Sequence, residues 1–242
     1  INFQIAFLSI NRSIKMQIII KSIHSKNYIV TIAHGEDYIK DLKNCSLPTW
    51  IKYCKKNDIG IIVFNKPLID KSSKNWKKAN WQKLLIGDIL GKSEVEIENV
   101  CFLDVDILIN HYAPNIFDFY DSNTFGLVSQ FFNTPFPIYQ TQKRIAFNRH
   151  FFYDIKYPLD SALFMGPKEI FKSMGLSEFD NYACTGLIMF NIKNHSQLMK
   201  SWFHKYPSDI KSLTGGEEPH LNWEIQNHGK ITWLDYKFQA IW

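Results

Sequence analysis

Two aspartates interrupt an otherwise apolar run in CFLDVDILIN, residues 101–110. In a strand, successive side chains alternate between faces, so Asp104 and Asp106 would point the same way with Cα atoms roughly 6.6 Å apart. Unpaired carboxylates inside a sheet that is covered on both faces would each cost several kcal/mol. We therefore expect one of two arrangements: the strand ends at Asp104, or a cation neutralises the pair.

These two arrangements are compatible, because ligands of open α/β sheets bind at the carboxyl edge, where a strand would end. A hard divalent ion such as Mg²⁺ takes carboxylate oxygens at about 2.0–2.1 Å and completes its shell with water and substrate phosphates. Asp104 and Asp106 are thus candidate ligands of a metal that also holds a diphosphate. The alternative is a solvated turn that ends the strand, because the DxD tripeptide is common.

The elements before this motif predict a parallel sheet. Residues 28–33 and 60–65 have strand character, and residues 48–55 between them begin with Pro at a plausible first helical turn. This strand, helix, strand order is typical of βαβ units. Residues 34–38 read as a loop, residues 80–90 as a helix and residues 100–109 as a third strand.

The second half of the chain is less regular. We expect strands at residues 125–129, 184–191 and 231–234 and a helix at 195–206, and residues 16–20 are a candidate first strand. No Gly/Ser-rich or Pro-rich linker divides the 242 residues, so a single domain is predicted.

The formal charge of +5 comes from dispersed Lys and Arg residues. Such a pattern does not favour a nucleic-acid partner. It fits a solvated, Lys-rich exterior, a phosphate-bearing substrate or peripheral contact with an anionic membrane. No apolar run reaches the roughly 18–20 residues of a spanning helix.

The four cysteines have neither CxxC nor Cys/His metal spacing. Cys101 lies in an apolar run, where a reduced, buried thiol is expected. A cytoplasmic location is therefore predicted. Because the chain begins with Ile1 rather than Met, we expect residues upstream of it.

Five segments resemble, in the same order, those of nucleotide-sugar-dependent glycosyltransferases of the GT-A fold, and the likeness is greatest to the glycogenin and galactosyltransferase kind. The segments are YIVTIAHGEDY, NWQKLLIGDIL, CFLDVDILIN with APNIFD, CTGLIMFN, and GGEEPHLNWEIQ with WLDYKFQAIW. The resemblance implies a Rossmann-like α/β fold with a mainly parallel sheet flanked by helices. It also implies a nucleotide-sugar half at about residues 17–110 and an acceptor half at about 111–242.

The activity that the resemblance implies is transfer of a sugar from a nucleotide sugar, UDP-linked in the first instance, to a glycan, lipid or protein acceptor with Mn²⁺ or Mg²⁺. The residues that match the donor and metal positions are Thr31, Ala33 and Tyr38 near the base, Lys83 at a basic position near the donor, Asp104, Val105 and Asp106 in the DxD motif near the diphosphate, and Gly186 in a small-residue turn near the sugar. Lys83 has a second interpretation as a surface lysine of a helix.

The chain departs from the family pattern in two places. Cys184 stands where many relatives carry Asn before the small-residue turn, which weakens a side-chain contact to the sugar there. The family often supplies a third metal ligand as a late His, for which His220 and His228 are the candidates. For each, the interpretation as an ordinary surface or structural histidine is favoured over that of a metal ligand.

Glu217 and Glu218 lie where relatives place an acidic residue near the sugar, so they are candidate general bases for the acceptor hydroxyl. They are equally well placed to begin a helix, where acidic residues favour the helix dipole. Residues 143–153 (KRIAFNRHFFY) alternate cations with aromatic rings and form either an acceptor lip or an amphipathic packing element.

Two other functions fit the same features. A sugar-nucleotide nucleotidyltransferase also combines an α/β sheet, a divalent metal and acidic residues, but it is expected to open with a Gly-rich basic loop, which HGEDYIKDLK does not resemble. A non-catalytic carbohydrate-binding module of the same fold would bind sugar without transferring it.

Overall fold

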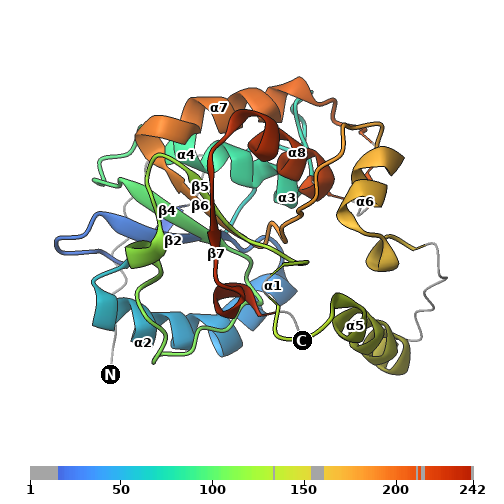
Figure 1. The fold of residues 1–242 in the computed structure, drawn as a ribbon. Helices are drawn as coiled ribbons and strands as arrows, with labels where there is room; N and C mark the ends of the chain where they lie inside the picture. The colour runs from blue at the N-terminus through green and yellow to red at the C-terminus, as the bar shows by residue number, and fades with distance from the viewer. Residues whose placement is uncertain (1–15, 133, 154–160, 211, 214–215, 241–242) are drawn as a thin grey trace. The chain divides into compact units, whose positions relative to one another are not determined.

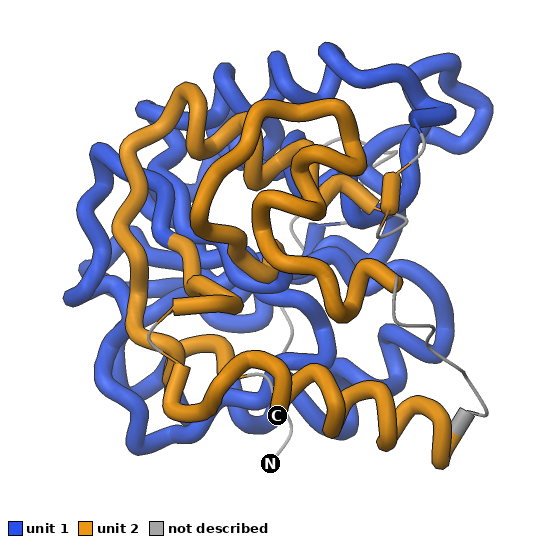
Figure 2. Tube along the Cα trace, turned by 45° about the vertical axis from the view of Figure 1, so that its right-hand side comes forward, with its two compact units in different colours: residues 1–126, 186–210 blue, residues 127–185, 211–242 orange. Residues whose placement is uncertain are grey.

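The computed structural model describes residues 16–132, 134–153, 161–210, 212–213 and 216–240. The chain divides into two compact units, each built from two segments (Figure 2). Unit 1 comprises residues 1–126 and 186–210, and unit 2 comprises residues 127–185 and 211–242. The whole predicted nucleotide-sugar half, residues 17–110, falls within unit 1. The roles assigned to the two halves stay predictions.

The sheet of unit 1 has the strand order β1-β3-β2-β4-β6-β5 (Figure 1). Its strands are β1 (Met16–Ile20), β2 (Asn27–Ile32), β3 (Gly60–Phe64), β4 (Asn99–Leu103), β6 (Leu187–Asn191) and β5 (Phe125–Val128), which crosses the unit boundary. The central strand β2 is parallel to both β3 and β4. The β1–β3, β4–β6 and β5–β6 pairs are antiparallel. The predicted α/β fold with a parallel core is confirmed, and the outer pairs make the sheet mixed.

Helices cover both faces of this sheet, with α2 on one face and α4 and α7 on the other (Figure 1). The helical segments of unit 1 are α1 (Glu36–Asp41), the π-helical η1 (Leu42–Ser46), α2 (Leu47–Asn57), α3 (Ala79–Gln82), η2 (Lys83–Leu85), α4 (Ile86–Leu90), η3 (Ile116–Phe119) and α7 (Ile192–Lys205). All five residues of β3 are buried, which fits a strand covered on both sides.

Unit 2 is built mainly from helices and 3-10 turns. Its elements are α5 (Ile138–Tyr153), η4 (Ala162–Phe164), α6 (Pro167–Ser173), α8 (Glu218–His228), β7 (Ile231–Leu234) and η5 (Tyr236–Gln239). A small core forms around the buried Ile170, Phe171 and Tyr182. Within the described part of the chain, no helix is both long enough and apolar enough to cross a bilayer.

Several sequence-based boundaries were wrong. The strand predicted at 184–191 begins at Leu187, and the helix predicted at 195–206 spans Ile192–Lys205. The strand predicted at 100–109 ends at Leu103, because the two carboxylates that follow are exposed rather than buried. The helix predicted at 80–90 consists of α3, η2 and α4 in succession. The loop predicted at 34–38 is shorter, because α1 begins at Glu36 after Gly35, whose φ of 108° favours glycine.

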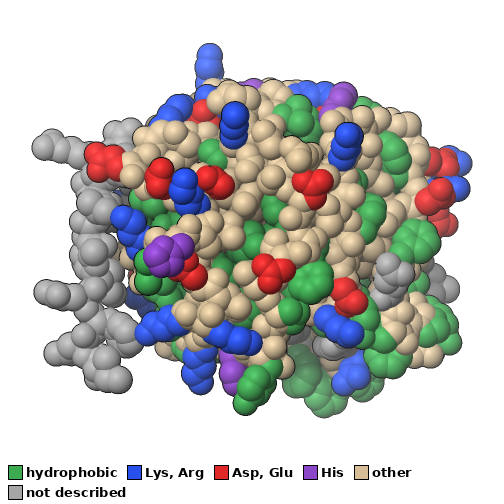
Figure 3. Space-filling view, turned by 60° about the vertical axis from the view of Figure 1, so that its left-hand side comes forward, with side chains coloured by type: hydrophobic (Ala, Val, Ile, Leu, Met, Phe, Trp, Pro, Cys, Tyr) green, Lys and Arg blue, Asp and Glu red, His purple; other side chains and the backbone are tan. Residues whose placement is uncertain are grey.

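The four cysteines are all free, and Cys101 is only 1% exposed. The predicted buried thiol is therefore confirmed. Burial raises the pKa of the Cys101 thiol well above its usual range. On the face drawn in Figure 3, Lys and Arg side chains lie among Asp and Glu side chains. This mixed face fits a solvated, Lys-rich exterior.

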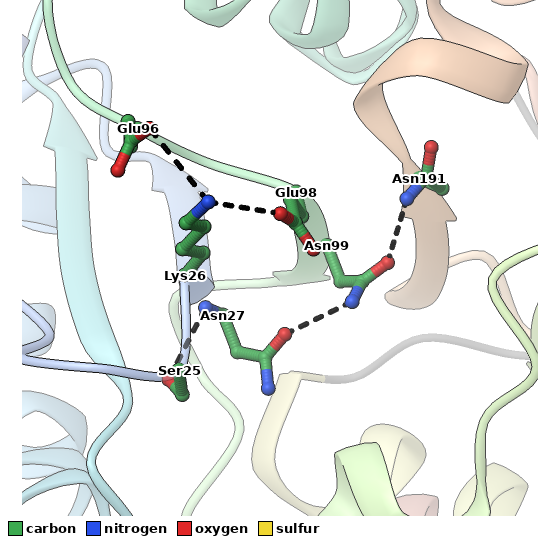
Figure 4. Close-up of polar contacts among 7 residues, drawn as sticks. All are labelled: Ser25, Lys26, Asn27, Glu96, Glu98, Asn99 and Asn191. Carbon is green, nitrogen blue, oxygen red and sulfur yellow. Dashed lines mark hydrogen bonds and ion pairs between the residues drawn. The ribbon is translucent and has the colours of Figure 1, made fainter.

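A chain of three amides fixes the register of β2, β4 and β6 (Figure 4). The Asn99 side-chain amide donates to the Asn27 carbonyl oxygen at 3.0 Å, and the Asn191 amide donates to Asn99 at 2.9 Å. Asn27 and Asn99 begin their parallel strands, so this chain lies at the amino ends of β2 and β4. It therefore aligns the two strands whose carboxyl ends lie beside the Asp104–Asp106 turn.

The pairing of β2 with β3 requires a glycine opposite an aromatic ring. Tyr28 is the register partner of Gly60, and a Cβ atom at Gly60 would lie 2.0 Å from the Tyr28 ring. We expect Gly60→Ala to lower the free energy of unfolding by about 1–3 kcal/mol or more, because the ring and strand must shift. Urea denaturation measures the change.

Gly166→Ala is the matched control, because its added Cβ would meet its nearest neighbour, a Glu169 carboxylate oxygen, at an ordinary 3.7 Å. We expect it to lower the free energy of unfolding by about 1 kcal/mol or less, because Gly166 is the N-cap of α6, where Ala is less favourable than Gly. Equal losses in the two variants would contradict the close approach of Tyr28 to Gly60.

Candidate functional site

The Asp104–Asp106 pair lies in a tight turn just beyond β4. Both side chains are exposed, and the Ile107 N–H donates to the Asp104 carbonyl at 3.2 Å. The Asp104 N–H donates to the Gly186 carbonyl at 2.8 Å, which continues the β4–β6 ladder one residue beyond the strand. The strand thus ends before Asp104, so neither carboxylate is buried in the sheet. This is the first of the two arrangements predicted from the sequence. Because the pair lies in a turn, the strand spacing predicted for it does not apply.

The end of η1 and the beginning of α2 hold this turn through its backbone. The buried Ser46 hydroxyl donates to the Val105 carbonyl at 2.5 Å. The indole N–H of Trp50, a residue with no exposed surface, donates to the Ile107 carbonyl at 2.7 Å. Two side chains one turn apart on the helix therefore satisfy two carbonyls of the turn.

The same face of α2 holds the segment that follows. The Ile109 N–H donates to the Thr49 hydroxyl at 3.1 Å. The Tyr53 hydroxyl donates to the Pro114 carbonyl at 2.9 Å and accepts from the Ile116 N–H at 2.8 Å. Residues 46, 49, 50 and 53 form one stripe at helical spacing. This stripe positions the whole chain segment from the aspartates to η3.

A pocket of about 440 Å³ in unit 1 lies beside the turn. Because β2 and β4 are parallel, the chain leaves both strands at the same edge of the sheet. The lining residues come from the end of β2 and start of α1, from the start of α3, and from the end of β4: Ile32, His34 and Tyr38; Lys78, Ala79 and Asn80; Phe102, Asp104, Val105 and Asp106. The volume falls within the range of small-molecule sites.

The residues predicted near the base divide into two groups. Tyr38 lines the pocket and is 60% exposed. Thr31 and Ala33 have no exposed surface, and neither is among the lining residues, whereas Ile32 and His34 are. This follows from the alternation of side chains along and just beyond β2. A role for Thr31 or Ala33 at the base stays a prediction.

Lys83 is buried and does not line the pocket. It is 2% exposed, and its ammonium lies 4.8 Å from the centre of the Phe102 ring, which lines the pocket. The surface-lysine interpretation is therefore wrong. Gly186 lies directly beside Asp104 through the hydrogen bond from the Asp104 N–H. The structure thus brings Gly186 to the aspartate pair and packs Lys83 against the pocket wall.

In unit 2, the two glutamates lie at the start of α8, as the helix-start interpretation predicts. Glu217 is buried and accepts a hydrogen bond from the Thr185 hydroxyl at 2.7 Å. Glu218 is half-buried and accepts from the Thr185 N–H at 3.4 Å. Both carboxylates therefore anchor the segment that leads to Gly186, and Glu218 also lines a pocket.

This second pocket lies within unit 2 and measures about 600 Å³. Glu218, Cys184 and Tyr182 form one part of its lining, and an α5 stripe that includes Ile138 and Ile145 forms another. Burial raises the pKa of Tyr182 far above its usual range, and the Glu218 and Glu217 carboxylates act in the same direction. The Tyr182 phenol is therefore neutral at physiological pH.

The late histidines also belong to unit 2. His220 is buried in α8, where burial lowers its pKa and the nearby Glu224 partly opposes that effect. His228 is exposed and lies 3.6 Å from the Glu224 carboxylate. Over the described ranges, no group of three or more His, Cys, Asp or Glu side chains is arranged to hold a metal ion. A third protein ligand stays a prediction.

The two carboxylates nevertheless fit a hard cation. They are exposed oxygen donors beside a pocket, and Mg²⁺ commonly uses one or two carboxylates together with water and substrate phosphates. A group of three protein ligands is not needed for such a site.

Sequence reasoning missed His34, Lys78 and Asn80 in the pocket and the stripe on α2. The signal for His34 was its position after β2, since the ends of parallel strands meet at one edge. For Lys78 and Asn80, the signal was the start of a helix after β3. Their meeting depends on the strand order β3-β2-β4, which a single sequence does not fix.

Comparison with known proteins adds little to this geometry. No protein-family model matches the sequence, and no curated protein matches it. One solved structure that is similar to this chain is that of a glycosyltransferase involved in the glycosylation of the major capsid of PBCV-1. The alignment covers 86% of this chain and 81% of the other chain, with 10% sequence identity and a TM-score of 0.48. We draw no functional conclusion from a likeness at this level.

The contact between Ser46 and the turn predicts a measurable effect. Ser46→Ala leaves the buried Val105 carbonyl without that donor, so we expect the free energy of unfolding to fall by about 1–3 kcal/mol. We also expect faster amide hydrogen exchange in residues 104–109. Urea denaturation and exchange mass spectrometry measure the two effects.

Ser201→Ala is the control, because Ser201 is an exposed α7 residue whose hydroxyl bonds within its own helix. Unchanged exchange at residues 104–109 in Ser46→Ala would contradict the role of this stripe in holding the turn.

Proposed function

We propose that this protein is a glycosyltransferase that moves a sugar from a UDP-sugar to an acceptor hydroxyl, with Mn²⁺ or Mg²⁺ held by Asp104 and Asp106. The observation that carries the proposal is the position of the pair. Two exposed carboxylates follow a buried parallel strand at its carboxyl edge, beside a pocket that an exposed aromatic ring also lines. The ordered sequence segments that resemble GT-A enzymes favour the same function.

The unit 1 pocket suits a nucleoside diphosphate in three respects. Tyr38 offers an exposed ring on which a base can stack. Lys78 and His34 add polar groups to the lining, and a cation would draw a diphosphate to the aspartate pair. Gly186, whose carbonyl accepts from the Asp104 N–H, has no side chain that could obstruct a sugar near Asp104.

Glycosyl transfer requires stabilisation of charge on the departing diphosphate and an acceptor hydroxyl placed in line with the anomeric carbon. When bound, the metal supplies Lewis-acid stabilisation of that diphosphate. The chain's own contribution is to hold the two carboxylates in a fixed turn, through Ser46, Trp50 and the Gly186 carbonyl.

The two candidate bases differ in their surroundings. Glu217 is buried and bonded to the Thr185 hydroxyl, so its first role is to hold the α8 start. Glu218 lines the unit 2 pocket, where an acceptor hydroxyl can reach a carboxylate. Of the two, only Glu218 lines a pocket, so we propose it as the base for an acceptor hydroxyl if the reaction inverts the anomeric centre.

The nucleotidyltransferase alternative fits the segment after β2 less well. The turn after β2 is short, and the first turn of α1 carries Glu36 and Asp37, which disfavour phosphate at that helix end. A non-catalytic module of the same fold would bind UDP-sugar but neither hydrolyse nor transfer it. A hydrolysis and transfer assay separates that alternative from the proposal.

The metal assignment predicts the effect of removing both carboxylates. In Asp104→Asn/Asp106→Asn, we expect Mn²⁺-dependent affinity for UDP to fall at least about 100-fold, because both protein ligands of the metal are lost. Isothermal titration calorimetry with UDP, with and without Mn²⁺, measures it. Since both side chains are exposed, the fold is retained.

Asp118→Asn is the matched control, an exposed aspartate of unit 1 that does not line the pocket. It should bind UDP and Mn²⁺ like the parent. If the double variant also binds like the parent, Asp104 and Asp106 do not hold the metal.

The base-stacking role of Tyr38 predicts a separate loss. We expect Tyr38→Ala to weaken UDP binding by about 10-fold, because stacking contributes roughly 1–3 kcal/mol per base. Tyr38→Phe should bind like the parent, since the ring is retained. Tyr112→Ala, which removes a 78% exposed ring outside the pocket, is the control. Equal affinities for Tyr38→Ala and Tyr112→Ala would remove Tyr38 from the nucleotide site.

A further inference from the structure

Helix α5 of unit 2 carries apolar side chains on two opposite sides. One side, which includes Ile138 and Ile145, lines the unit 2 pocket. The opposite side is exposed to solvent and comprises Tyr139, Lys143, Arg144, Phe147 and Phe151, which we call the α5 outer face. The first side has a structural role in the pocket, whereas the second carries aromatic rings that the described residues of unit 2 leave exposed.

The exposure of this face is unusual for aromatic residues. The exposed fractions are 55% for Tyr139, 65% for Phe147 and 71% for Phe151, and the adjacent Phe152 is also 71% exposed. The Phe147 and Phe151 rings stack with centroids 6.0 Å apart, and the Phe151 and Phe152 rings meet edge to face at 5.1 Å. The rings thus form a contiguous apolar surface, which in a soluble protein marks an interaction site.

The charge on this face has one sign. Lys143 and Arg144 lie on it, and residues 122–153 contain no Asp or Glu at all, although acidic residues number 23 in the 242-residue chain. An apolar helix face flanked by cations and free of acidic residues is complementary to the interface of an anionic bilayer. Two cations are too few to favour nucleic acid, and the exposed rings are not explained by phosphate contacts.

We infer that the α5 outer face docks on the surface of a membrane that contains anionic phospholipids. The Phe147 and Phe151 rings enter the boundary between headgroups and acyl chains, and Lys143 and Arg144 contact lipid phosphates. The helix lies in the plane of the surface. The side of α5 that lines the unit 2 pocket then faces away from the bilayer, one helix diameter, roughly 10–12 Å, from the docked face.

Vesicle sedimentation tests this inference without any assay of activity, so it is independent of the proposed function. The full chain is mixed with phosphatidylcholine vesicles, with and without phosphatidylglycerol. We expect sedimentation with the anionic vesicles that weakens in high salt. Phe147→Ser/Phe151→Ser should lower the vesicle affinity by about 10-fold or more. Lys143→Ala/Arg144→Ala should lower it by about fivefold for each cation, on anionic vesicles alone.

Ile23→Ser/Tyr112→Ser is the matched control, because it removes two side chains that are 80% and 78% exposed outside α5. It should sediment like the parent. Circular dichroism of each variant confirms that the fold is retained. The inference is overturned if the Phe147→Ser/Phe151→Ser variant sediments like the parent. It is also overturned if the parent binds neither kind of vesicle. One such outcome is a parent that does not bind vesicles but forms dimers, while the Phe147→Ser/Phe151→Ser variant does not form them. That result would assign the face to a second copy of the chain instead.

Discussion

The high cost of burying unpaired carboxylates determines the organisation of unit 1. Asp104 and Asp106 follow a strand whose last residues are buried, so the strand cannot continue through them without a loss of several kcal/mol. The chain turns instead, and the Asp104 N–H bonds to the Gly186 carbonyl as β4 ends. Both carboxylates then face solvent beside the pocket, at the edge of the sheet where ligands of α/β folds bind. The functional proposal depends on this single change of direction.

A turn held only by its own hydrogen bonds would be a poor base for a metal site, since coordination needs fixed geometry. Two features of unit 1 supply that rigidity. At the carboxyl edge, Ser46, Thr49, Trp50 and Tyr53 bond to the backbone of the turn and of the segment after it. At the amino ends of the parallel strands, the Asn27–Asn99–Asn191 chain aligns β2, β4 and β6. The backbone groups of the turn are thus hydrogen-bonded, and the register of the strands before it is fixed. The side chains of Asp104 and Asp106 remain exposed on this fixed backbone.

Much of the parallel core could be predicted, because β2 and β3 are apolar, short and separated by a helix that begins with Pro. The end of β4 was predicted by the cost of burying carboxylates rather than by the strand pattern. Strand propensity alone extended the strand to Ile109, whereas Asp104 and Asp106 required either the end of the strand or a bound cation. The pocket walls were predicted less well. Thr31 and His34 differ by only three positions, and which of them lines the pocket depends on the phase of the strand. The side chains at the end of η1 and the start of α2 that hold the turn bond to residues nearly 60 positions away, and no local pattern reveals such a contact.

The central claim is that a nucleoside diphosphate and its divalent cation meet at Asp104 and Asp106. Anomalous diffraction from crystals grown with UDP and Mn²⁺ tests it most directly, because the Mn²⁺ signal locates the ion independently of any assay. The account predicts an anomalous peak within roughly 2.0–2.6 Å of oxygens from both carboxylates. It also predicts diphosphate oxygens on the other side of the ion and the base near Tyr38. A nucleotide bound away from the unit 1 pocket, or a peak that neither aspartate contacts, would contradict it.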